Sequence, residues 1–353
     1  MDVRARQAST LLDLIPPGNR ASRAGLRRGR LCGMLARTAM IPFPEMNYSM
    51  LLLFALMGAG APSQAQQAPA FELEDIAPGN VVHYGALEDR SRDNLGDQAN
   101  IGFIVGSRCV AVVDTGGSFR IGEQLRAAIR TRTDLPVCYV IMTHVHPDHV
   151  FGAAAFKADN PIYVGHENLP RALQQRGKFY LNALKRDLGE LAAGTELIPP
   201  TLLVKDELKL DLGGRTVVLR AWPVGHTDND ITVFDQQTGT LWTSDLLFLQ
   251  HTPVVDGSIV GLLSVIDQLR AVPARHFVAG HGRTALPWPE ALEPERRYLE
   301  LILTETRLAL KQRKTIQEAV DTVGLSEEPN WVDFELFHRR NVTAAYTELE
   351  WED

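Results

Sequence analysis

The stretch 141–152, IMTHVHPDHVFG, places four side chains that can bind a metal within six residues. They are His144, His146, Asp148 and His149. The run before them, 137–142, is continuously apolar, which is typical of a strand buried on both faces. The pattern therefore predicts four ligand-type side chains on the loop that leaves a buried strand.

Imidazole and carboxylate groups are ligands that zinc takes in proteins. If the chain stays extended after the strand, His144 and His146 point to the same side, and Asp148 and His149 follow on the next turn. All four would crowd one ion, whereas two ions about 3.5–4 Å apart would accommodate them. We therefore expect two zinc ions, although the same ligand set also accepts iron or manganese.

Two ions need more ligands, and candidates follow three later apolar strands of the predicted fold. These candidates are His226 in PVGHTDND, Asp245 in LWTSDLLF and His281 in FVAGHGR. The simplest assignment gives the first ion three imidazoles, those of His144, His146 and His226. The second ion then takes Asp148, His149 and His281. Asp245 can bridge both ions, because a carboxylate has two oxygens.

The order of predicted elements indicates an α+β fold. Short strands come first, followed by one crossover helix at 119–132, two hairpins, a helix at 258–269 and a last strand at 276–279. This order suits two mixed sheets packed face to face with helices outside, and it does not suit a doubly wound sheet. We expect a catalytic domain at 66–286 and a helical extension at 287–353. The long polar stretch 86–99 is a candidate flap.

The HxHxDH motif at 144–149, followed by a His, an Asp and a His at strand ends, resembles the metallo-β-lactamase superfamily in its glyoxalase-II-like binuclear form. The resemblance covers residues from about 80 to 283, with all seven ligand positions present. It implies a four-layer αββα sandwich and the assignment of ligands given above. It also implies a supporting role for Asp114 in VVDTGG, whose carboxylate would orient a ligand histidine.

Two positions distinguish this chain from other branches of the superfamily. The cysteine-containing β-lactamases have a Cys where Asp245 stands, and flavodiiron relatives have a Glu in place of His146. The segments GHTDND and FHRRNVTAAYTELEWE resemble a smaller group, the exported zinc metallohydrolases associated with pyrroloquinoline-quinone dehydrogenases, or quinoprotein-relay group. This narrower resemblance implies no particular substrate.

The expected activity is hydrolysis of a small molecule. Zinc lowers the pKa of bound water to about 7, so a metal-bound hydroxide is available to attack an ester, thioester, lactone or (β-lactam) amide. Asp148 is the candidate catalytic residue, because it can orient the nucleophile or shuttle a proton. The alternatives are a mononuclear Fe(II) oxygenase resembling persulfide dioxygenases and a non-catalytic binding protein.

The first 65 residues resemble an export leader. They carry eight Arg and three acidic residues, then an apolar stretch at 50–60 and the small-x-small sequence Ser63-Gln64-Ala65. We predict cleavage after Ala65 and export, most simply to the periplasm. An uncleaved anchor or a later start at Met34, Met40 or Met46 is the alternative.

The rest of the chain carries 28 basic and 40 acidic residues, so it is a poor partner for nucleic acid. We expect no membrane span in the mature chain, and the oligomeric state stays open. Cys109 and Cys138 can form a disulfide in an oxidising compartment or remain buried thiols.

A few further polar residues have two possible roles. His166 and His251 either line the cleft or make local contacts, and Asp228 and Asp230 are best explained as turn formers beside His226. The segment 338–341, HRRN, could reach over the cleft and hold an anionic substrate, but an exposed helix face is the simpler interpretation.

Overall fold

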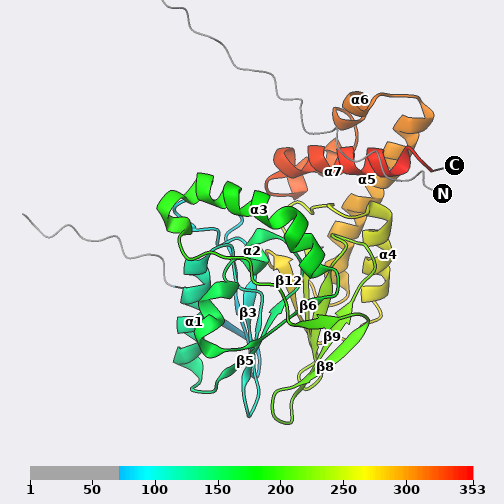
Figure 1. Cartoon of the computed structure of the whole chain (residues 1–353). Helices are drawn as coiled ribbons and strands as arrows, with labels where there is room; N and C mark the ends of the chain where they lie inside the picture. The colour runs from blue at the N-terminus through cyan, green and yellow to red at the C-terminus, as the bar shows by residue number, and fades with distance from the viewer. Residues whose placement is uncertain (1–70, 353) are drawn as a thin grey trace, which may run out of the picture. The chain divides into compact units, whose positions relative to one another are not determined.

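Two β-sheets pack face to face in the computed structural model, which describes residues 71–352, and helices cover the outer face of each sheet (Figure 1). The first sheet has the order β1-β2-β3-β4-β5-β6-β7. Its strands are β1 (Glu74–Ala77), β2 (Asn80–His83), β3 (Ile101–Val105), β4 (Val110–Val113), β5 (Val137–Met142), β6 (Ile162–His166) and β7 (Leu202–Val204).

The second sheet has the order β12-β11-β10-β9-β8. Its strands are β8 (Glu207–Asp211), β9 (Thr216–Ala221), β10 (Ile231–Asp235), β11 (Thr240–Phe248) and β12 (His276–His281). The helices are α1 (Phe119–Arg132), α2 (Pro147–Val150), α3 (Leu169–Leu188), α4 (Ile259–Leu269), α5 (Glu293–Lys311), α6 (Ile316–Val320) and α7 (Phe334–Leu349). The predicted α+β sandwich with C-terminal helices is confirmed.

Strand β4 shows how the sequence produces the layers. Successive side chains of a strand point to opposite faces of its sheet. Val110 and Val112 therefore pack under α1, whereas Ala111 and Val113 pack into the core between the two sheets. All four residues are buried, which explains why the strand is continuously apolar.

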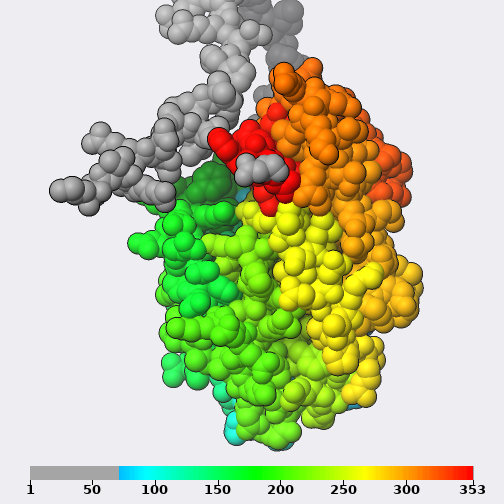
Figure 2. Space-filling model, turned by 90° about the vertical axis from the view of Figure 1, so that its right-hand side faces the viewer, coloured from blue at the N-terminus to red at the C-terminus, as the bar shows by residue number. Residues whose placement is uncertain are grey.

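The C-terminal helices share a hydrophobic core with α4 and β11. Tyr298 of α5 and Val342 of α7 are buried in the same cluster as Ile259 of α4 and Leu241 of β11. Figure 2 shows the orange and red C-terminal helices lying against the yellow segment that contains α4. Helices α5 and α7 therefore form part of the outer layer on the second sheet.

Cys109 and Cys138 form a disulfide, which decides between the two alternatives left by the sequence. The bond ties the start of β4 to β5, the two neighbouring strands that lead to Asp114 and to the HxHxDH motif. The segment 1–65 and its predicted cleavage site lie outside the described residues. Within 71–352, none of the helices combines the length and the apolar character that a bilayer crossing requires.

Candidate metal centre

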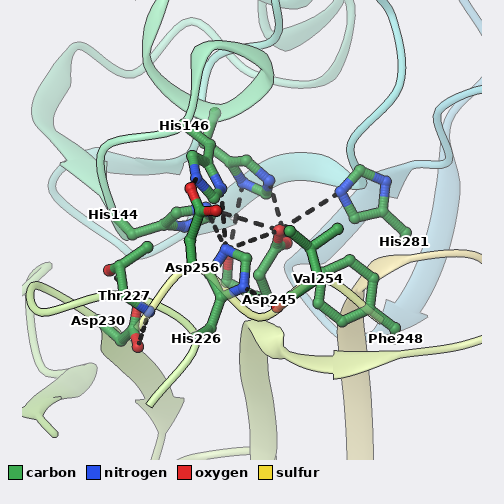
Figure 3. A network of polar contacts seen from close by, with 12 residues as sticks. His144, His146, His226, Thr227, Asp230, Asp245, Phe248, Val254, Asp256 and His281 are labelled. Atoms are coloured by element: carbon green, nitrogen blue, oxygen red, sulfur yellow. Dashed lines mark hydrogen bonds and ion pairs between the residues drawn. The ribbon is translucent and has the colours of Figure 1, made fainter. Parts of the chain in front are cut away.

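All seven predicted ligands converge at one edge of the sandwich, where strands of both sheets end. Figure 3 labels five of them: His144, His146, His226, Asp245 and His281. The segment after β5 supplies His144 and His146, and the short helix α2 carries Asp148 and His149. His226 follows β9, and His281 is the last residue of β12. We call these residues and Asp245 the ligand cluster.

Asp245 lies inside a strand, whereas the sequence analysis placed it after one. Strand β11 continues to Phe248, and its pairing with β12 becomes irregular at Ser244, which has a φ of +48°. The positive φ of Ser244 coincides with the irregular pairing of β11 and β12. The next residue, Asp245, places its carboxylate among the histidines.

The cluster divides into two groups of potential ligand atoms. The first contains His144, His146, His226 and Asp245, and the second contains Asp148, His149 and His281. Within each group the ligand atoms lie within 4.8 Å of one another.

The Asp245 carboxylate faces both groups. Its Oδ2 atom is 3.3 Å from His226 Nε2 and its Oδ1 atom is 3.1 Å from His149 Nε2. The carboxylate thus lies between histidines of both groups, and its bridging role stays a prediction.

Two hydrogen bonds hold the imidazoles of the first group from behind. His226 Nδ1 donates to the Val254 carbonyl at 2.7 Å, and His146 Nε2 donates to Asp256 Oδ2 at 2.9 Å. In neutral imidazoles, the opposite nitrogens then carry lone pairs. These two nitrogens, His226 Nε2 and His146 Nδ1, are only 2.8 Å apart. A cation bound to both lone pairs would relieve their repulsion.

A cation would also satisfy two buried atoms where the second group meets Asp245. Among the described residues, His149 Nε2 and Asp245 Oδ1 are buried without a hydrogen-bond partner. Leaving a buried polar atom unpaired costs about 1–3 kcal/mol, so the site is best satisfied by a ligand that both atoms can bind. The donor set of imidazoles and carboxylates fits a divalent metal such as zinc.

The charges in the cluster are complementary. Burial lowers the pKa of the His144 imidazole well below its usual range, and the neighbouring His149 adds to this effect. Burial also disfavours charged His281, but the carboxylates of Asp245 and Asp148 outweigh it and raise its pKa to about 9. His144 therefore favours the neutral imidazole, whereas protons compete with a cation at His281 as the pH falls.

Asp114 holds the second group from behind. Its Oδ2 accepts a hydrogen bond from His149 Nδ1 at 2.8 Å and another from the Thr143 hydroxyl at 2.8 Å. Its Oδ1 accepts from the Thr143 backbone N–H at 2.8 Å. Asp114 is thus placed to fix the ring orientation of His149, which is the role implied by the resemblance.

Asp256 was not predicted as part of the site. Its carboxylate accepts a hydrogen bond from His146, as the Asp114 carboxylate does from His149. Asp256 lies in the loop between β11 and α4, 110 residues along the chain from His146, and no local pattern marks it. Two nearby hydroxyls were also missed as parts of the site, because Thr143 and Ser244 meet at 2.7 Å beside Asp114.

Replacing Asp256 with alanine is expected to weaken zinc binding by about 10- to 100-fold, because His146 loses the acceptor that orients it. Chelator competition on the purified full chain measures this affinity. Asp267→Ala is the matched control, since Asp267 is an exposed carboxylate that pairs with Arg296. Equal zinc affinity in both variants would show that Asp256 does not support the site.

The other residues singled out in the sequence lie outside the ligand cluster. His166 accepts from the Asn168 N–H, and Asp230 holds the turn at Thr227, as expected for a turn former. Asp228 pairs with Arg171. His251 is buried with its ring centroid 5.2 Å from that of His281.

The segment 338–341 is not a uniformly exposed helix face, so that interpretation is wrong for two of its residues. His338 is buried and contacts the Tyr298 hydroxyl, and Asn341 is buried and donates to the Pro253 carbonyl. Arg339 and Arg340 are exposed. The candidate flap 86–99 is tied to α3 by the ion pair between Arg90 and Asp187 and by a hydrogen bond from Arg92 to the Leu188 carbonyl.

Glu295 of α5 is a fully buried carboxyl behind the cluster. Its Oε2 accepts from the Phe248 N–H at 3.1 Å, and its Oε1 has no hydrogen-bond partner in the described part of the chain. Burial raises the pKa of Glu295 from the usual 4.5 to about 8; the Phe248 N–H opposes this rise, and the charge on Asp245 adds to it.

This raised pKa predicts a pH-dependent stability. Between about pH 4.5 and pH 8 the folded chain holds a proton that the unfolded chain has lost, so Glu295 makes stability fall as the pH rises. Glu295→Gln keeps an acceptor but does not titrate. Urea unfolding of the metal-loaded proteins should show the variant gaining stability relative to wild type from pH 5 to 8, on the order of a few kcal/mol. If the difference in the free energy of unfolding between variant and wild type stays constant from pH 5 to 8, Glu295 does not have a raised pKa.

The fold and the ligand cluster together define a metal-binding αββα protein. Residues 95–303 match the metallo-beta-lactamase superfamily, and the chain belongs to this superfamily, whose members bind divalent metals, typically zinc.

Curated relatives and solved structures agree with this assignment. A beta-lactamase-like protein 2 homolog from Caenorhabditis elegans is 23% identical over 209 residues, which are 59% of this chain and 62% of the relative. A linear primary-alkylsulfatase from a Pseudomonas strain is 25% identical over 253 residues, 61% of this chain and 48% of the relative. The chain thus spans about half to three fifths of the length of these relatives.

Two solved structures share the fold. The sec-alkylsulfatase Pisa1 from Pseudomonas sp. aligns with a TM-score of 0.62 at 16% identity, over 78% of this chain and 50% of that one. The metallo-β-lactamase TMB-1 aligns with a TM-score of 0.51 at 18% identity, over 66% of this chain and 98% of that one.

Proposed function

We propose that this chain is a hydrolase that uses two divalent metal ions, with zinc as the first candidate. The observation that carries the proposal is the convergence of seven ligand-type side chains. His226 Nε2 and His146 Nδ1 lie 2.8 Å apart, and His149 Nε2 and Asp245 Oδ1 are buried without a hydrogen-bond partner among the described residues. A single iron bound by two histidines and an aspartate, as in the oxygenase alternative, would leave several of these side chains without a partner.

The bound ions would supply a water of lowered pKa and polarise an oxygen of the scissile group. The chain's own residues would hold the ions and move protons. In the second group, the side chain of Asp148 is 18% exposed, compared with 0% for His149 and 8% for His281. Asp148 is therefore the member that can exchange a proton with substrate or solvent.

The bond cleaved is proposed to be that of an ester, thioester, lactone or amide. Two similar proteins bear the name alkylsulfatase, so sulfate esters join the classes to be tested. The test is a hydrolysis screen over these classes with the zinc-loaded full chain, with and without a chelator. Chelator-sensitive turnover of at least one class is expected. Oxygen uptake on a persulfide by a chain holding one iron would contradict the proposal.

We also propose that the chain is exported to the periplasm. The basic leader with its apolar stretch supports this, and the Cys109–Cys138 disulfide suits an oxidising compartment. Mass spectrometry of the protein recovered from fractionated cells should find a mature N-terminus after Ala65. Intact protein in the cytoplasmic fraction, with both cysteines reduced, would contradict export.

A further inference from the structure

Two arginines from different helices meet at Asp256, beside the ligand cluster. Arg176 of α3 places Nη1 3.1 Å from Asp256 Oδ2, the same oxygen that His146 Nε2 contacts at 2.9 Å. Arg340 of α7 places Nη2 3.8 Å from Asp256 Oδ1. Figure 1 shows α3 and α7 at the same end of the sandwich. One carboxylate therefore joins a candidate metal ligand to two positive charges.

These two positive charges exceed the negative charge that faces them. Asp256 carries one charge and already accepts from His146. Asp228 nearby pairs with Arg171, and within residues 71–352 neither Arg176 nor Arg340 has a second carboxylate partner. This leaves a net positive charge at the rim of the site.

Both arginines also keep free donors directed to solvent. Their side chains are 44% exposed in Arg176 and 61% exposed in Arg340. Within residues 71–352, the Arg340 side chain makes no hydrogen bond, and its ion pair with Asp256 is long, at 3.8 Å. A guanidinium has five N–H donors in a fixed fork that matches carboxylate, sulfate or sulfonate oxygens.

A hollow of about 830 Å³ begins at Asp256 and Arg340 and extends between the 255–257 loop and helices α6 and α7. Apolar side chains, including Val255, Val320 and Ala344, line much of it. Asp256 thus contacts His146 of the ligand cluster and also lines, together with Arg340, a hollow with apolar walls.

We propose that the substrate carries an anionic group beside an apolar chain, and that Arg176 and Arg340 bind the anionic group while the reacting bond lies at the ligand cluster. The proposal rests on the hydrolase function above and adds the substrate class. The competing explanation is that the arginines only hold α3 and α7 against Asp256.

The first experiment measures binding alone. Hexane-1-sulfonate and the neutral hexanamide are titrated into the zinc-loaded full chain by calorimetry. Arg176→Gln and Arg340→Gln should each weaken sulfonate binding roughly three- to tenfold, which is modest because both side chains are partly exposed. Hexanamide binding should not change. Absence of sulfonate binding to wild type, or sulfonate binding by both variants that is as tight as in wild type, would overturn the proposal.

Arg186→Gln is the matched control for the first experiment. Arg186 lies on α3 like Arg176, is 73% exposed and pairs with Asp187 of the same helix. It should leave sulfonate binding unchanged. If Arg186→Gln weakens sulfonate binding as much as Arg176→Gln and Arg340→Gln do, the effect comes from general surface charge. Arg176 and Arg340 then do not form a specific anion site.

The second experiment compares mono-(4-nitrophenyl) glutarate with its neutral methyl ester. Arg176→Gln and Arg340→Gln should raise KM for the anionic substrate more than for the neutral one, so that the ratio of the two kcat/KM values falls roughly three- to tenfold. Equal losses on both substrates would indicate that the arginines only hold the helices. If the zinc-loaded wild type hydrolyses no class in the wider screen, the hydrolase function fails, while sulfonate binding still tests the anion site separately.

Discussion

Asp245→Asn is expected to lower kcat/KM by about three orders of magnitude and to reduce the bound metal below two ions per chain. Asp245 is 3% exposed, and its carboxylate lies within 3.5 Å of histidines from both groups of the ligand cluster. An amide of the same shape cannot supply two anionic oxygens, and the loss of several kcal/mol of metal-dependent stabilisation corresponds to this factor. Metal analysis and steady-state kinetics on the same preparation measure both effects.

Asp235→Asn is the matched control for this variant. Asp235 is also fully buried, and it pairs with Arg215 away from the ligand cluster. Its replacement should lower the stability of the fold but leave two metal ions bound. If Asp245→Asn instead keeps two ions and activity within tenfold of wild type, Asp245 does not bridge the two groups.

Asp114→Ala has the second largest expected effect, a loss of zinc affinity of about 10- to 100-fold together with a stability loss of about 3 kcal/mol or more. The Asp114 carboxylate is buried, and its removal leaves the Thr143 N–H and His149 Nδ1 without their acceptor. Urea unfolding and chelator competition report the two losses separately.

Asp114→Asn distinguishes the role of Asp114 in the site from its role in the backbone. Asp114 has a φ of +56°, a conformation that asparagine tolerates better than alanine. Asparagine also keeps one acceptor oxygen, so this variant should recover most of the stability and part of the zinc affinity. If alanine lowers stability but leaves zinc affinity unchanged, Asp114 supports the fold alone.

The ligand cluster could be predicted largely from the sequence because its members follow a local rule. Each lies at or near the end of an apolar strand, and strands of one sheet deliver their ends to a common edge. Strand β5 has the predicted bounds, Val137–Met142, because its continuous apolar run is a strong signal. The end of β11 was missed, because Ser244 and Asp245 interrupt its apolar pattern although all nine of its residues are buried.

Features set by distant contacts could not be predicted. Strand β7 has three residues and forms by pairing with β6, so it has no periodicity of its own. Asp256 supports the site through its contact with His146, which is distant in the sequence. Arg340 approaches Asp256 only because α7 packs in the outer layer on the second sheet. The sequence left the Cys109–Cys138 pairing open, because it did not specify the distance between β4 and β5.

The most direct measurement is anomalous diffraction at the zinc edge from crystals of the zinc-loaded chain. We expect two peaks, one among the imidazoles of His144, His146 and His226, and one among Asp148, His149 and His281, with Asp245 contacting both. A single peak, or zinc bound away from these side chains, would contradict a binuclear centre.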